Sequence, residues 1–378
     1  MVRAKVLRER DEHYMSLALT EAARGDWRTH PNPMVGAVVV RGDAVLATGY
    51  HEAAGQDHAE VVALRKLGMQ AQGAELFVTL EPCHHHGRTP PCTSALIGAG
   101  ISRCVIGSVD PDPRVSGRGI AALGAAGVVC EVGVLEAACQ ALNAPFFKRV
   151  LHGLPYVTLK MAMTLDGRIA TVQGSSQWIS GEASRAEVQE MRRRHDAVMV
   201  GTGTVAADDP RLTVRSGDGP RRQPLRVVLD RRLRLRPEAQ VFDGKAATLL
   251  FTREACLGEG VARFAGRDIE VQSVGEGDAG LDLGAVLRRL VSSRRVTTLL
   301  CEGGGELAAS LLSSSLVDEL VVFVAPKVVG GRTAPGPVGG LGVGEMAEAL
   351  SFDFVSWRQV GADLCLVAKP RIAATRGG

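Results

Sequence analysis

Short apolar runs alternate with helix-like stretches through the first 150 residues. Residues 35–40, 44–50 and 75–80 are strand-like, and the first two form a hairpin around Arg41-Gly42-Asp43. Apolar side chains recur at helical spacing in residues 11–24 and 59–68. The pattern continues with a helix at 92–99, a strand at 103–107, a helix at 119–126, a strand at 128–132 and a helix to about Arg149. This alternation predicts an α/β layer sandwich.

A second pattern of the same kind starts after His152-Gly153-Leu154-Pro155, which interrupts the last of these helices. Residues 156–163, 197–200 and 296–301 are strand-like, and helical stretches lie between them. A chain of 378 residues is too long for one ordinary core. We therefore expect two abutting α/β domains, residues 1–150 and 154–378, without a long linker.

Composition narrows the class of protein. Hydrophobic residues make up 46% and charged residues 22%, as in globular proteins, and the net charge of +3 gives no reason to expect a nucleic-acid partner. The 8 cysteines form no C-x-x-C pair. Four of them lie in apolar strand-like runs, which favours buried free thiols in a reducing compartment: Cys104, Cys130, Cys301 and Cys365. No apolar run approaches the ~20 residues of a membrane span, and the charged N-terminus does not resemble a signal peptide. We expect a cytoplasmic protein with no membrane contact.

The chemistry of the first domain centres on His58-Ala59-Glu60, Glu81-Pro82-Cys83 and Pro91-Cys92. One imidazole and two thiolates can hold zinc and leave the fourth position to water, whose pKa falls to about 7. Glu60 can move the proton from this water to a leaving amine if it stays off the metal. His58 and Cys92 each open a predicted helix, and helix N-termini favour thiolate and hydroxide.

Each of these signals has a plainer interpretation. H-x-E alone is weak, and a single cysteine is more often a small buried hydrophobe. The combination is far more specific, although the loop between Cys83 and Cys92 is longer than in P-C-x-x-C. Asn32, fixed between two prolines, could present its amide to a flat heterocycle or be a turn residue. His51, His85 and Arg88 are candidates to hold a phosphorylated substrate, whereas His84 and His86 are interpreted as loop residues.

Four motifs resemble those of the bifunctional deaminase/reductase family of riboflavin biosynthesis. They are T-H-P-N-P-x-V-G at 29–36, H-A-E-V at 58–61, T-L-E-P-C-x-H-x-G-R-T-P-P-C at 79–92 and D-P-x-P-x-V-x-G-x-G at 110–119. The resemblance extends over the whole chain. It implies a cytidine-deaminase-like α/β/α sandwich in the first domain, with zinc on His58, Cys83 and Cys92 and a substrate-binding role for Asn32.

In the second domain, the predicted strand at 296–301 runs into Glu302-Gly303-Gly304-Gly305 and a helix that ends near Leu312. A strand, a glycine turn and a helix N-terminus let backbone N–H groups approach a pyrophosphate. The G-x-G-x-x-G fingerprint is absent, and such a turn alone is more often a tight loop. The stretches 165–168, 176–179 and 201–210 also match the reductase half of the same family.

The resemblance implies a dihydrofolate-reductase-like α/β fold here, with NADPH as cofactor. The implied cofactor contacts are Ala162, Trp178, Thr204, Asp208, Gly304, Gly305, Glu306, Leu307, Ala308, Ala309 and Ser310. The implied substrate contacts are Ser176, Arg192, Leu212, Arg215 and Glu302. Arg192 and Arg215 are suitable phosphate ligands because a guanidinium group binds phosphate bidentately. The alternative interpretation is that both are solvated surface charges. Arg231 occupies a position where relatives carry a small hydroxyl residue at the adenosine end of the cofactor. Whether Arg231 contacts the cofactor therefore stays open.

The resemblance predicts two reactions on a phosphorylated pyrimidine. Zinc-dependent hydrolysis removes the 2-amine of 2,5-diamino-6-ribosylamino-4(3H)-pyrimidinone 5′-phosphate, and NADPH then reduces the ribosyl group of 5-amino-6-(5-phosphoribosylamino)uracil to ribityl. We expect a homo-oligomer, dimer or tetramer. Two alternatives are a nucleic-acid deaminase, which would not need the second domain, and a zinc-stabilised scaffold, which would leave Glu60 without a role.

Overall fold

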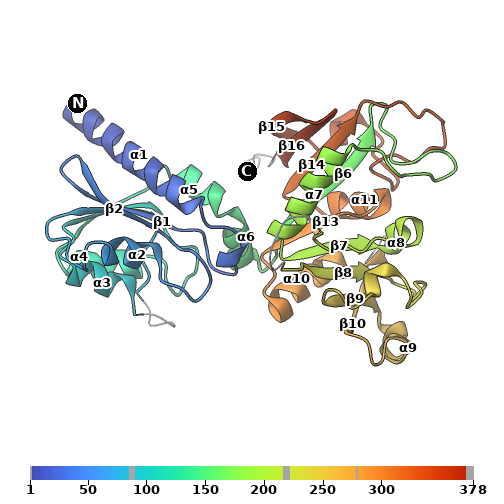
Figure 1. The fold of residues 1–378 in the computed structure, drawn as a ribbon, viewed down its shortest axis with the longest axis horizontal. Helices are drawn as coiled ribbons and strands as arrows, with labels where there is room; N and C mark the ends of the chain where they lie inside the picture. Colours follow the sequence, from blue (N-terminus) through green and yellow to red (C-terminus); the bar gives the residue numbers. More distant parts are fainter. Residues whose placement is uncertain (1, 85–89, 216–221, 278–279, 372–378) are drawn as a thin grey trace. The chain divides into compact units, whose positions relative to one another are not determined.

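The computed structural model describes residues 2–84, 90–215, 222–277 and 280–371. The chain divides into two compact units, Met1–Gly153 and Leu154–Gly378 (Figure 1). The first unit ends three residues later than the expected limit of 150, because helix α6 (Ala144–His152) continues to its C-cap at Gly153.

A five-stranded sheet forms the centre of the first unit, in the order β2-β1-β3-β4-β5 within the described residues. Strand β1 is antiparallel to both β2 and β3, so the predicted hairpin is present, and β3, β4 and β5 run parallel. The bounds are Gly36–Arg41 (β1), Ala44–Tyr50 (β2), Glu75–Leu80 (β3), Arg103–Ser108 (β4) and Val129–Val132 (β5).

Helices cover both faces of this sheet (Figure 1). On one face, Leu64, Leu96 and Leu123 pack against strand residues such as Val39 and Ile106. These leucines come from α2 (Ala59–Arg65), α3 (Cys92–Gly98) and α4 (Arg118–Ala125). The other face packs against α1 (Val2–Ala22) and α5 (Glu136–Leu142). The predicted α/β/α sandwich is confirmed.

Two predicted helices differ from the observed ones. The first begins earlier than residue 11, because the charged residues before it continue the helix, with Arg8 paired to Glu12 one turn on. The helix expected to run to Arg149 is two helices, α5 and α6. They meet at Asn143, and Pro145, which has no N–H to donate, lies in the first turn of α6.

The second unit contains a nine-stranded sheet in the described residues, in the order β10-β9-β8-β7-β13-β6-β14-β16-β15. Strands β10 to β14 in that order run parallel, whereas β16 and β15 are antiparallel. The bounds are Tyr156–Thr164 (β6), Ala197–Gly201 (β7), Leu225–Leu229 (β8), Thr248–Arg253 (β9), Ile269–Val274 (β10), Thr298–Cys301 (β13), Glu319–Ala325 (β14), Phe352–Val360 (β15) and Asp363–Pro370 (β16).

Helices pack on both faces of this sheet as well. Helices α10 (Leu283–Arg294) and α11 (Gly305–Ser313) bury Leu287 and Leu311 against one face. Helix α7 (Glu182–Arg194) buries Val188 on the other, together with Phe323. The remaining elements are α8 (Thr202–Asp208), α9 (Leu257–Arg263), the short pair β11 (Glu276–Gly277) and β12 (Gly280–Leu281), and the 3₁₀ turns Trp27–Thr29, Gln240–Phe242, Glu254–Cys256 and Met346–Glu348. Among the described residues, no helix is long and apolar enough to span a membrane.

Gly36 lets α1 lie directly on the first strand of the deaminase-like sheet. A Cβ atom at this position would be 2.0 Å from the Ala18 carbonyl oxygen and 2.5 Å from the Ala22 nitrogen. Both atoms belong to the α1 backbone, which cannot move aside as a flexible side chain would. The packing of α1 against the sheet therefore requires glycine at this position.

We predict that Gly36→Ala destabilises the first unit by about 3 kcal/mol, the upper part of the range for overpacked cores. The measurement is the urea unfolding midpoint followed by far-ultraviolet circular dichroism. Gly124→Ala is the matched control, since Gly124 lies exposed on α4 with no heavy atom within 4 Å of the added Cβ. This control should leave the midpoint unchanged or raise it. Equal midpoints for Gly36→Ala and the unmodified chain would contradict the packing argument.

Candidate active sites

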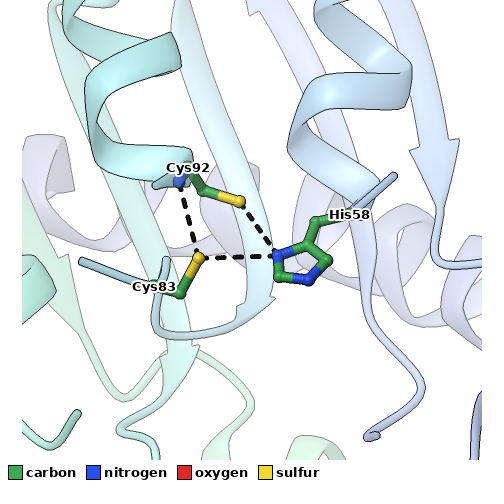
Figure 2. A group of neighbouring side chains, drawn as sticks. All are labelled: His58, Cys83 and Cys92. Carbon is green, nitrogen blue, oxygen red and sulfur yellow. Dashed lines mark hydrogen bonds between the residues drawn. The ribbon is translucent and has the colours of Figure 1, made fainter. Parts of the chain in front are cut away.

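Three side chains from separate segments meet in the first unit (Figure 2). His58 is the N-cap of α2, Cys83 follows β3, and Cys92 is the first residue of α3. His58 Nδ1 lies 3.1 Å from Cys92 Sγ and 3.5 Å from Cys83 Sγ. Tetrahedral zinc with ordinary Zn–N and Zn–S bonds separates its ligand atoms by about 3.6 Å. The three predicted ligands therefore fit a single zinc ion.

The protonation states of His58, Cys83 and Cys92 depend on one another. Hydrogen bonds from Cys92 and His58 lower the pKa of Cys83 to about 4. The hydrogen bond to Cys83 raises the pKa of His58 to about 9, and the thiol of Cys92 has its pKa raised because it lies against Cys83. Such a cluster already favours one thiolate, and a bound cation would displace the remaining protons.

Glu60 lies beside this cluster without belonging to it. It is in the first turn of α2, only 3% exposed, and its carboxyl group is within hydrogen-bonding reach of the Cys92 thiol. Burial raises its pKa. A buried carboxyl group that does not ligate the metal matches the arrangement expected of a proton carrier.

Asn32 and His51 lie next to the same cluster. His51 Nδ1 is 3.0 Å from the Asp57 carbonyl oxygen, so it carries the hydrogen, and Nε2 accepts a hydrogen bond from Asn32 Nδ2 at 3.3 Å. Burial lowers the pKa of His51, which keeps the ring neutral, and the ring packs edge-on to His58 at 5.5 Å. Two other predicted substrate contacts, His85 and Arg88, lie outside the described residues.

Two residues that no sequence motif marks, Asn143 and Arg149, hold the Asn32 turn. Asn143, only 2% exposed, accepts a hydrogen bond from Met34 N and donates one to Met34 O, both at 2.8 Å. Arg149 Nη2 donates to the Pro31 carbonyl oxygen at 2.8 Å. Neither residue lies in a motif, and the contacts span more than 100 positions, so no local pattern marks them.

Glu81, in the T-L-E-P-C motif, has a structural role that its place in the motif does not indicate. Its buried carboxylate accepts hydrogen bonds from Gly117 N at 3.0 Å and Gly119 N at 2.9 Å. A Cβ atom at Gly119 would lie 2.0 Å from the Pro82 carbonyl oxygen. The D-P-x-P-x-V-x-G-x-G motif thus packs directly on the chain that leads into Cys83.

A cavity of about 800 Å³ opens in the second unit near the carboxyl ends of β6, β7 and β13. Ligands in parallel α/β sheets bind at this edge. The predicted contacts that line the cavity are Ala162, Ser176, Trp178, Arg192, Thr204, Asp208, Leu212, Arg215, Glu302 and Gly304.

The remaining predicted cofactor contacts do not line the cavity. They are Gly305, Glu306, Leu307, Ala308, Ala309 and Ser310, all on α11. Ala308 is fully buried in the hydrophobic core, so its side chain faces the sheet. Glu306 turns toward the neighbouring loop, where its carboxylate lies near Gly340 N at 3.4 Å.

A nearly buried ion pair between Arg192 and Glu302 lines this cavity. Arg192 Nε and Nη2 donate to the two carboxylate oxygens of Glu302 at 2.6 and 2.9 Å, and Arg192 Nη1 donates to the Thr213 carbonyl oxygen at 3.3 Å. Burial opposes ionisation of Glu302, but the guanidinium outweighs it and lowers the pKa of Glu302. Arg192, predicted as a phosphate ligand, has its guanidinium bound to protein groups here.

Lys160 was not predicted from the sequence. It lies on β6 and lines the cavity; burial lowers its pKa, while Glu302 acts in the opposite direction. A lysine within the apolar run of a strand is the signal that could have identified it. Across the cavity, Ser176 Oγ donates to Asp208 Oδ1 at 2.6 Å.

Arg215 and Trp178 lie at the exposed side of the cavity. Burial and the neighbouring guanidinium of Arg192 lower the pKa of Arg215, so two cations already repel each other there. The Arg185 guanidinium stacks on the Trp178 ring at 4.7 Å. Arg231, two residues after the end of β8, is not among the residues that line the cavity, and it pairs with Glu276.

The fold and the sites define a zinc deaminase unit joined to a nucleotide-cofactor reductase unit. Residues 8–108 match the cytidine and deoxycytidylate deaminase zinc-binding region, and residues 155–366 match the RibD C-terminal domain. The chain belongs to the RibD family, whose members are bifunctional deaminase/reductases of riboflavin biosynthesis that use zinc and NADPH. The reductase match excludes a deaminase without a second domain.

Similar proteins cover nearly the whole chain. Riboflavin biosynthesis protein RibD of Aquifex aeolicus is 40% identical over 96% of this chain and 99% of its own length. The Escherichia coli protein of the same name is 40% identical over 94% and 98%. The structure of Acinetobacter baumannii RibD has a TM-score of 0.86 at 37% identity and covers 97% of this chain and 100% of that chain. A Thermotoga maritima diaminohydroxyphosphoribosylaminopyrimidine deaminase/5-amino-6-(5-phosphoribosylamino)uracil reductase has a TM-score of 0.82 at 35% identity, covering 96% and 99%.

We predict that Cys83→Ser lowers bound zinc well below one equivalent, because serine replaces a thiolate that already favours its charged form. Zinc is measured by atomic emission on purified protein. Cys130→Ser is the control, since Cys130 is a free, partly exposed thiol on β5. Full zinc occupancy in Cys83→Ser would exclude Cys83 as a ligand.

Proposed function

We propose that the first unit deaminates 2,5-diamino-6-ribosylamino-4(3H)-pyrimidinone 5′-phosphate and that the second reduces the ribosyl group of 5-amino-6-(5-phosphoribosylamino)uracil to ribityl. The observation that carries the first assignment is a zinc-compatible trio with a buried, non-ligating carboxyl group beside it. The Thermotoga maritima relative is named as the deaminase and the reductase of these two substrates, which supports both assignments.

Zinc, when bound by His58, Cys83 and Cys92, would lower the pKa of water to about 7 and so supply hydroxide at neutral pH. Glu60 takes the proton that water loses and delivers it to the departing ammonia. Its burial suits both steps, since a carboxyl group with a raised pKa can accept and return a proton. Asn32 offers its amide to the pyrimidine, and neutral His51 orients that amide.

NADPH, when bound in the second unit, would supply the hydride. Thr204 and Gly304 lie at the starts of α8 and α11, where backbone N–H groups can receive the cofactor phosphates. Ala162 and Trp178 line the same cavity. In this proposal α11 contributes its N-terminal backbone, and the side chains from Leu307 to Ser310 contribute its packing.

On the substrate side, we assign the phosphate to Arg215. Its guanidinium lines the cavity mouth, whereas Arg192 is bound to Glu302 and Thr213. Arg192 then holds Glu302 in position. Ser176 and Leu212, which line the same cavity, are the remaining proposed substrate contacts. Lys160 extends this set, because it lines the same cavity and the charge of Glu302 acts to raise its pKa against the effect of burial.

We also propose that the protein is a cytoplasmic homo-oligomer that binds no nucleic acid. Eight free cysteines support a reducing compartment. The net charge of +3 over 378 residues gives little attraction for a polyanion.

Glu60→Gln should lower the rate of ammonia release by roughly 10²–10⁴-fold, because glutamine cannot carry the proton. Zinc content should stay at the unmodified level, since Glu60 is not a ligand. Glu52→Gln, at an exposed glutamate shortly before the same helix, is the matched control and should keep full activity. Near-normal deamination by Glu60→Gln would disprove the proton-carrier role.

Arg215→Ala should raise the KM for the phosphorylated substrate of the reductase by roughly tenfold or more, as expected for a lost charge-assisted phosphate contact. The KM for NADPH should change less. The assay follows NADPH oxidation with the deaminated intermediate. The control is Arg194→Ala, an arginine paired with Glu190 on α7 outside the cavity lining. A larger effect on NADPH than on the substrate would place Arg215 on the cofactor side.

A further inference from the structure

The segment that carries Arg215 is held by side chains rather than by secondary structure. Residues 209–215 follow helix α8 and belong to no helix or strand. Within the described part of the chain, residues 211–214 make no backbone–backbone hydrogen bond. Asp209 and Leu212 have φ of +42° and +53°, in the left-handed region that residues other than glycine rarely adopt. A backbone of this kind keeps its shape only where its surroundings fix it.

The Gln223 side chain binds both backbone polar groups of Val214, the residue directly before Arg215. Val214 N donates to Gln223 Oε1 at 2.8 Å, and Gln223 Nε2 donates to the Val214 carbonyl oxygen at 3.1 Å. The amide thereby replaces the two hydrogen bonds that a neighbouring strand would make with such a residue. Val214 is buried and Gln223 is half-buried, two residues before β8. Gln223 is not among the residues that line the cavity, so it fixes this backbone from outside the site.

Helix α7 holds the same segment at two further points. Its residues Gln189 and Arg192 are three positions apart, so they lie on one face of the helix, and both line the cavity. Gln189 Oε1 accepts a hydrogen bond from Arg215 N at 2.8 Å. Arg192 Nη1 donates to the Thr213 carbonyl oxygen at 3.3 Å. Side chains therefore fix the backbone at three successive residues, 213 to 215.

The charges around Arg215 explain why its backbone benefits from this support. Burial lowers the pKa of Arg215, and the guanidinium groups of Arg192 and Arg211 lower it further. Glu302 acts in the opposite direction, but it is already paired with Arg192. Repulsion between like charges favours movement of the Arg215 side chain away from the cavity as long as no anion is bound there. A backbone that is fixed beforehand lowers the cost of ordering this arginine when the phosphate binds.

We propose that Gln223 and Gln189 are positioning residues of the reductase. By holding the backbone of Val214 and Arg215, they place the Arg215 guanidinium where it meets the phosphate of the substrate. This inference rests on the proposed function, in which Arg215 binds that phosphate. Neither glutamine transfers a proton or a hydride, so each contributes to substrate binding rather than to the chemical step. Loss of either side chain therefore raises the KM for the phosphorylated substrate more than it lowers kcat.

The test is a double-mutant cycle on the full zinc-loaded chain, followed by NADPH oxidation with the deaminated intermediate. Gln223→Met keeps the size of the side chain but removes both hydrogen bonds to Val214. It should raise the KM for the phosphorylated substrate roughly threefold to tenfold and change the KM for NADPH less. In the Arg215→Ala background, the same substitution should change the substrate KM by about twofold at most, because the guanidinium that it positions is absent. Gln272→Met is the matched control and should leave both KM values unchanged, since Gln272 is a half-buried glutamine on β10 that is not among the cavity-lining residues.

The outcomes separate the positioning role from the proposed function. If Arg215→Ala alone leaves the substrate KM unchanged, Arg215 does not bind the phosphate, and both that assignment and this inference are wrong. If Arg215→Ala raises the substrate KM but Gln223→Met does not, the positioning role alone is overturned. An effect of Gln223→Met that is equally large with and without Arg215 would also overturn it. If Gln223→Met does not fold, Gln189→Met, which removes the acceptor of the Arg215 N–H, decides the question in the same cycle.

Discussion

The meeting of a strand end with a helix start determines where chemistry is possible in both units. Cys83 follows β3 and stands against the first residue of α3, and Glu302 follows β13 and precedes the turn into α11. Parallel strands align these ends along one edge of a sheet, and the helix starts contribute unpaired N–H groups there. A thiolate cluster and a carboxylate–guanidinium pair are thereby placed in fields that favour negative charge.

Within the reductase cavity, the Arg192–Glu302 pair determines the roles of its neighbours. Removing either partner would leave a buried charge without compensation, which is costly. The pair is bidentate and nearly excluded from water. In the proposed function it therefore holds Glu302 in a fixed position beside Lys160 and the bound substrate. In the proposed function, binding of the substrate phosphate then falls to Arg215, which lies at the exposed side of the cavity.

Sequence patterns predicted the groups whose chemistry depends on local spacing. His58, Cys83 and Cys92 could be predicted because each lies next to a recognisable strand or helix end. The predicted limits of the short strands around them agree with the observed limits within one or two residues. Sequence patterns could not predict the roles of Asn143, Arg149 and Lys160, because these roles depend on contacts made only in the folded chain. The strand order of the large sheet could not be predicted from the sequence either, because β13 and β14 pair with β6 across more than a hundred residues.

Helix α6 shows why the limits of a domain matter for its chemistry. It contributes Arg149, which holds the Pro31 carbonyl oxygen, and its last turn is closed by Gly153, whose N–H donates to the Arg149 carbonyl oxygen at 3.0 Å. Gly153 has φ +64°, a left-handed conformation that glycine adopts without strain. A chain stopped at residue 150 would lose this cap and fray the turn that carries Arg149. The Asn32 turn would then lose one of its supports, although every zinc ligand would still be present. We therefore expect full deaminase activity to require residues 151–153 as well, so a loss of activity on truncation at 150 would not by itself implicate residues from the second unit.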